Sequence, residues 1–181
     1  MRMEKLCYLD KAGADIGPML DINGRVIRLS QDAPSPKGAS WWLGNQQIEL
    51  SFDSWIDMYP TPEHEGLVVI FPKDNATPFP FPDNAAIYNA DGSLRFRLRA
   101  PKPLSRHWPG YVHTAEQIEK RPPEGFWQVG WNVNDFGALC AWEAPYLMWA
   151  NIGLHCDVYE RRYFDPKTGE FDLEHYSTAR R

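Results

Sequence analysis

The chain has 181 residues, a formal net charge of −5 and a hydrophobic fraction of 43%. This length fits one domain with its own core, and the composition excludes a wholly disordered chain. Eight Trp, eight Tyr and nine Phe favour strands, while 16 Pro and 13 Gly favour turns over long helices. We therefore expect a single β-rich domain over residues 1–181.

The earlier half of the chain contains three structural signals. An Asn-Gly pair at 23–24 predicts a tight hairpin before residues 25–29. Residues 52–59 place large apolar side chains at helical spacing, so this segment is either a short helix ended by Pro60 or an irregular strand. Residues 66–71 form a continuous apolar run, which is typical of a strand buried on both faces.

Turn chemistry predicts two later hairpins, at Asn89–Gly92 and at Asp165–Gly169. After the first turn, residues 94–99 alternate Leu or Phe with Arg, which predicts a strand with one dry face and one wet face. Residues 127–133 alternate Trp with Val through the odd positions, and 139–142 form a short apolar run, so both are expected strands.

Helix is scarce in this pattern. Thr114 is positioned to cap a short helix over residues 115–120, with Gln117 completing a capping box. The sequence therefore predicts a mainly β fold, a β-rich α+β protein. Its architecture is an antiparallel sheet of successive hairpins with one or two short helices.

Three cysteines, Cys7, Cys140 and Cys156, form no CxxC pair and are odd in number, which argues against a disulfide framework. We read them as buried free thiols of a reducing compartment. The first 13 residues lack the apolar core of a signal peptide, and no window is long enough for a spanning helix. We expect a cytoplasmic protein with no membrane partner.

The charges are sorted along the chain. Residues 45–91 carry eight acids against one base, Lys73, whereas residues 92–121 carry seven bases and two acids. These charges either solvate different faces or form an acidic surface that docks a basic protein partner. An acidic surface disfavours nucleic acid as the partner. Under the docking interpretation, the binding residues are the acids of this stretch and two nearby aromatics: Asp53, Asp57, Glu63, Glu65, Asp74, Phe79, Phe81 and Asp83.

The two aromatics come from a Pro-Phe alternation over residues 78–82, which proline keeps extended. Phe79 and Phe81 either staple this loop to the core or serve as exposed anchors for a partner. Both interpretations remain open at this point.

No complete catalytic motif is present. The sequence has no GxSxG nucleophile elbow, no P-loop and no dinucleotide fingerprint. His155 and Cys156 are adjacent in an expected strand and point to opposite faces, while His107 and His113 supply only two ligands, so we expect no metal and no cofactor. A hydrolase using a carboxylate or His in a cleft, or a carbohydrate-binding module with a row of exposed Trp, remain alternatives.

Residues 67–101 carry a resemblance to a known class of proteins. Val68–Phe71, then Asp83-Asn84, then Ile87–Gly92 leading into an alternating strand resemble bacterial immunity proteins of polymorphic and type VI secretion toxin systems. The resemblance implies a cytoplasmic antitoxin that binds one cognate toxin and occludes its active site. Such a protein needs no catalytic residue of its own.

Overall fold

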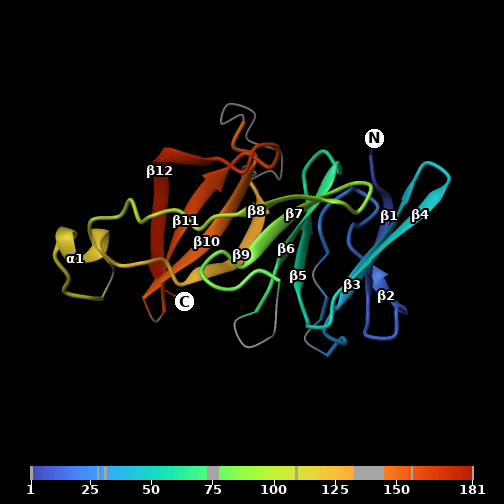
Figure 1. The fold of residues 1–181 in the computed structure, drawn as a ribbon, viewed down its shortest axis with the longest axis horizontal. Helices are drawn as coiled ribbons and strands as arrows, with labels where there is room; N and C mark the ends of the chain where they lie inside the picture. Colours follow the sequence, from blue (N-terminus) through green and yellow to red (C-terminus); the bar gives the residue numbers. More distant parts are fainter. Residues whose placement is uncertain are drawn as a thin grey trace. The chain divides into compact units, whose positions relative to one another are not determined.

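The structure is a computed structural model, and it describes residues 2–27, 29–30, 32–72, 78–108, 110–132, 145–155 and 157–180. Strands account for 47% of the described residues and helix for 3%, and these residues form three antiparallel sheets and one short helix (Figure 1). This confirms the mainly β prediction.

Contacts along the chain divide it into two compact units. Unit 1 comprises Met1–Pro80 with Ala85–Arg97, and unit 2 comprises Phe81–Asn84 with Leu98–Arg181. Each unit has its own sheet structure, so each is described by itself. The expectation of one domain over residues 1–181 stays a prediction.

Unit 1 contains two four-stranded sheets. The first has the strand order β2-β1-β3-β4 and consists of β1 (Glu4–Leu9), β2 (Asp15–Pro18), β3 (Gly38–Leu43) and β4 (Gln46–Ser51). The second has the order β5-β6-β7-β8 and consists of β5 (Asp57–Pro60), β6 (Gly66–Ile70), β7 (Ala85–Asn89) and β8 (Leu94–Leu98), whose last residue belongs to unit 2.

Apolar side chains from both sheets form the core of unit 1. The fully buried Trp41 on β3 donates its indole N–H to the carbonyl oxygen of Ala90 at 2.6 Å. Every residue of β6 is buried, which confirms the strand expected over residues 66–71. The buried cluster contains Met3, Leu6, Tyr8, Met19, Ala39, Trp41, Ile56, Met58, Leu67, Val69, Phe71, Ala86, Tyr88 and Ala90.

Unit 2 is built on one sheet with the order β12-β11-β10-β9 and a short helix (Figure 1). Its elements are β9 (Gly125–Trp131), β10 (Met148–His155), β11 (Val158–Phe164), β12 (Phe171–Arg180) and α1 (Ala115–Glu119). The Thr114 side chain accepts the Gln117 backbone N–H, and the Gln117 side chain accepts the Thr114 N–H, so the predicted capping box is confirmed.

The two later hairpins are also confirmed. Asn89–Gly92 joins β7 to β8, and Asp165–Gly169 joins β11 to β12. Each closing glycine donates its backbone N–H back into the turn and has a positive φ, +83° at Gly92 and +75° at Gly169. Left-handed backbone at these positions explains the glycines.

Of the two alternatives left open for residues 52–59, the strand is formed at residues 57–60 as β5, because pairing with β6 outweighs the local helical spacing. Two other expectations need correction. The Asn23-Gly24 turn is closed by a single bridge between Leu20 and Val26. The described residues of 25–29 do not form the expected strand.

The second correction concerns alternation. Leu98 on β8 is buried, but Leu94 is 48% exposed because β8 lies at a sheet edge with one neighbour. On β9 the pairing with β10 shifts, and Trp127 and Gln128 are both half-buried in succession. A β-bulge of this kind breaks the period of two. Val133 and the run 139–142 lie outside the described residues.

Cys7 is free and half-buried, so its thiol is less enclosed than expected. Burial, followed by the neighbouring Asp15, raises the pKa of Cys7 to about 11. Cys140 and Cys156 lie outside the described residues. None of the helical residues described here forms a segment long and apolar enough to cross a membrane.

Candidate functional site

The β5–β6 hairpin of unit 1 carries four of the predicted binding residues, at its two ends. Asp57 is the first residue of β5 and pairs with Ile70 at the end of β6. Asp53 lies four residues before Asp57 in the chain. Glu63 and Glu65 lie in the connection at the opposite end. All four carboxylates belong to exposed residues. A four-residue strand separates the ends by roughly 10 Å, so they form two sites and not one patch.

At the first end, Asp53 lines a hollow of about 410 Å³. Lys37 donates its ammonium N–H to the Asp53 carbonyl oxygen at 2.7 Å, which fixes the backbone beside the carboxylate. The hollow is lined by Lys11, Ser51, Phe52, Asp53, Ser54, Phe71 and Pro78.

Phe79 is partly buried against the core of unit 1. Its ring centroid lies 5.3 Å from that of Phe71, and the Arg97 guanidinium lies 5.9 Å from the Phe79 centroid. Arg97 also donates to the Pro80 carbonyl oxygen at 3.0 Å. Phe79 therefore staples its loop to the core, one of the two roles open from the sequence.

The remaining predicted residues are not part of this hairpin. Asp83 and Phe81 belong to unit 2, where Asp83 accepts the Ala100 backbone N–H at 2.9 Å. The half-buried Phe81 ring lies against Gly125, where an added Cβ would come within 2.5 Å of the ring. Asp74 lies outside the described residues.

The second end of the hairpin is built around His64, which is only 5% exposed and has a φ of +54°. Two nitrogens of the Arg2 guanidinium, Nε and Nη2, lie 3.1 and 3.0 Å from His64 Nδ1. Met3 donates its backbone N–H to the His64 carbonyl oxygen at 2.8 Å. Burial and then the Arg2 charge lower the pKa of His64, so its ring is neutral and Nδ1 accepts from Arg2.

His64 also forms one end of a surface groove of about 720 Å³. One wall is β1 with its flanking residues, and the other is the Asp21–Gly24 turn. The groove is lined by Arg2, Met3, Glu4, Lys5, Leu6, Cys7, Pro18, Leu20, Asp21, Ile22, Asn23, Gly24 and His64.

Lys5 on β1 has a φ of +50°, so it too has left-handed backbone. The β1–β3 register shifts between Glu4 and Cys7, which places Lys5 in a bulge. Its ammonium lies 5.8 Å from the ring centroid of Trp42 on β3. Lys5 and His64 are the non-glycine residues with positive φ in the described chain, and both line this groove.

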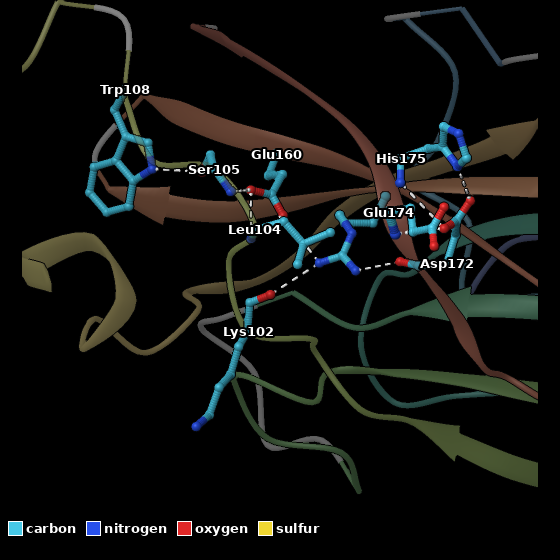
Figure 2. Close-up of polar contacts among 9 residues, drawn as sticks. Lys102, Leu104, Ser105, Trp108, Glu160, Asp172, Glu174 and His175 are labelled. Carbon is cyan, nitrogen blue, oxygen red and sulfur yellow. Dashed lines mark hydrogen bonds and ion pairs between the residues drawn. The ribbon is translucent and has the colours of Figure 1, made fainter. Parts of the chain in front are cut away.

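Unit 2 contains a buried ion pair between Glu160 and Arg162, which lie two residues apart on β11. Figure 2 shows Glu160 with its partners Leu104 and Ser105. Glu160 and Arg162 are each 1% exposed and lie 3.2 Å apart. Glu160 accepts the backbone N–H groups of Leu104 and Ser105, and Arg162 donates to the carbonyl oxygens of Lys102 and Asp172. Burial lowers the pKa of Arg162, although Glu160 opposes that shift.

Because these contacts hold residues 102–105 and the start of β12 onto the sheet, the pair is a structural anchor. Glu160 and Arg162 are enclosed and have no exposed surface to offer a ligand.

His113, one of the two histidines considered as ligands, lies in an aromatic cluster of unit 2. His113 approaches His155 at the end of β10, with ring centroids 5.4 Å apart, and both contact Tyr111. Tyr111 donates its hydroxyl to Asp157 at 2.9 Å. Across the described ranges, no three His, Cys, Asp or Glu side chains are grouped to hold a metal ion.

The tryptophans divide between core and surface. Trp41 and Trp108 are buried, while Trp42 and Trp55 are 37% and 49% exposed on separate elements. Trp142 lies outside the described residues.

Comparisons with known proteins give one informative match. No family model and no curated protein sequence matches the chain. The fold matches a chain in a solved structure described as Tne2 in complex with Tni2. That match has a TM-score of 0.57 and 13% identity, and it covers 99% of each chain. At this identity it shows a shared fold over the full length.

Sequence reasoning missed the groove. The Asn23-Gly24 pair correctly predicted the turn that forms one wall, but no local pattern marked Arg2 or Lys5. Their placement depends on β1 pairing with β3 and on the distant loop at His64. Positive φ is rare at Lys, and although His adopts it more often, no local pattern at either residue predicts it.

Proposed function

We propose that this chain is an immunity-type protein that binds a cognate bacterial toxin and neutralises it by occluding its active site. The full-length fold match carries the proposal, since the matched chain belongs to a structure described as Tne2 in complex with Tni2 and residues 67–101 resemble immunity proteins. The proposal places the protein in the cytoplasm, in a type VI or polymorphic toxin system, and requires no catalytic residue.

The exposed carboxylates of the β5–β6 hairpin support the same function. Asp53, Asp57, Glu63 and Glu65 are exposed on a hairpin whose β6 is fully buried. A rigid hairpin can present charge to a partner with little loss of conformational entropy on binding. Complementary charge of this kind mainly speeds association, and the partner surface opposite Asp53 and Asp57 is basic.

The test uses the product of the neighbouring open reading frame. The proposal expects it to be toxic when expressed alone, harmless beside this chain, and co-purified with it. A harmless neighbour that does not co-purify contradicts the proposal.

Charge reversal then tests the acidic surface. Asp53→Lys with Asp57→Lys is expected to slow association about tenfold, with a weaker dependence on salt. Glu170→Lys with Glu174→Lys is the matched control, since both residues are exposed on unit 2. Equal association rates for the two variants would assign toxin binding to another surface.

A further inference from the structure

The groove between β1 and the Asp21–Gly24 turn combines three features that no structural role requires together. It contains strained backbone, two cations with no counter-ion among the described residues, and a fully exposed apolar side chain.

The strain lies on two different chain segments. Lys5 at +50° and His64 at +54° are 59 positions apart in sequence, yet they line the same groove. Left-handed backbone is unfavourable for Lys and uncommon for His, although His adopts it more often than most residues, and such backbone tends to cluster at functional sites. A glycine at either position would remove this strain, so the side chains must contribute something that glycine cannot.

The N-terminal segment presents two cations to the groove, Arg2 and Lys5. Arg2 is exposed and contacts the neutral ring of His64, and Lys5 is exposed and lies near the Trp42 ring. Within the part of the chain that the structure describes, no carboxylate lies within ion-pair distance of either side chain. The Asp21 carboxylate across the groove is already engaged, since its Oδ1 accepts the backbone N–H groups of Asn23 and Arg25 at 2.8 Å.

The rim of the groove presents Ile22, which is completely exposed. Its turn is rigid, because Gly24 donates its backbone N–H to the Asp21 carbonyl oxygen at 3.0 Å and the Asp21 side chain accepts two more. A rigid apolar side chain gains from contact only when a large surface covers it. A small anion would leave Ile22 in water, so this feature favours a protein as the occupant.

We propose that this groove receives a carboxylate-bearing, apolar segment of the cognate toxin, whose carboxylate pairs with Arg2 and Lys5 while its apolar part covers Ile22. This inference rests on the proposed function and adds a second contact of opposite sign. The first end of the hairpin meets a basic surface through Asp53 and Asp57, and the groove meets an acidic one. A partner that presents both positive and negative charge in the right places binds in preference to a competitor that presents only one sign of charge.

The decisive variant is Lys5→Gly. Glycine accepts the left-handed backbone, so the fold and its thermal midpoint are retained or improved, while the cation is lost. We expect toxin affinity to fall roughly tenfold or more, the size expected for losing one charge-assisted contact. Lys5→Arg is expected to retain binding, because the charge is kept. Lys102→Glu on unit 2 is the matched surface control and is expected to bind like the wild type.

The probe is again the product of the neighbouring open reading frame, measured by calorimetry with purified wild type and variants. If the wild type binds but Lys5→Gly, Lys5→Glu and Ile22→Asp all bind equally well, the groove inference is overturned and the proposed function stands. If the wild type does not bind, both are overturned.

A further measurement uses inorganic phosphate, to test whether the groove binds a small anion. If phosphate raises the thermal midpoint of wild type but not of Lys5→Gly, and toxin affinity is the same for both, the groove is a small-anion site and the inference is wrong. The expected result is a loss of toxin affinity with no phosphate-dependent shift.

Discussion

Two regions of this molecule handle charge in opposite ways. In unit 2, Glu160 and Arg162 are enclosed, paired with each other and hydrogen-bonded to backbone (Figure 2). In unit 1, Arg2 and Lys5 are exposed, near strained backbone, and contact only neutral rings among the described residues. The first arrangement is what stability requires, whereas the second is what a binding surface requires, since it keeps charge available to a partner.

The largest expected effect is at the buried pair. Glu160→Ala leaves Arg162 as an uncompensated buried charge and deprives two backbone N–H groups of their acceptor. We expect a loss of about 3–5 kcal/mol in the free energy of unfolding. Urea denaturation measures it, with Glu174→Ala as the exposed control on unit 2, which is expected to change stability by no more than about 0.5 kcal/mol. Comparable losses in both variants would remove the contrast between the two regions.

The groove is expected to respond in the opposite direction. Lys5→Gly relieves left-handed strain, and we expect the free energy of unfolding to rise by up to about 1 kcal/mol, since glycine's extra entropy in the unfolded chain offsets part of the gain. Thermal unfolding beside Lys5→Ala, which keeps the strain, measures this difference. If Lys5→Gly is less stable than Lys5→Ala, the backbone at Lys5 is not strained. The proposed difference between the strained groove of unit 1 and the stable ion pair of unit 2 is then wrong.

How far the sequence predicted these regions follows from what local pattern can encode. The apolar run at 66–71, the glycine turns after β7 and β11, and the Thr114 cap were predictable, because each depends on neighbours in sequence. The ends of β5 were not, because pairing with β6 decided them.

The site divides in the same way. The exposure of Asp53, Asp57, Glu63 and Glu65 followed from their polar surroundings in the sequence, whereas their separation onto two ends followed from the hairpin. The Arg2–His64 contact joins residues 62 positions apart, and the Glu160 contacts join residues 55 and 56 apart, so neither has a local signal.

The smallest expected effect is the pH dependence at His64, which probes whether the groove is built on a neutral ring. Burial and the Arg2 charge lower the pKa of His64 below its usual value of about 6.5. The unfolded chain therefore binds the proton more readily, and this contribution to stability is complete above about pH 6.5 and is lost as the pH falls below it.

His64→Asn removes the titration while tolerating the left-handed backbone. We expect the wild type to lose stability between pH 7.5 and 5.5 by more than His64→Asn does, with carboxylates such as Asp21 contributing only at lower pH, because their pKa values are also lowered. Parallel pH profiles for the two proteins would show that the position of Arg2 does not depend on a neutral His64 ring. Other groove residues would then hold the Arg2 guanidinium in place.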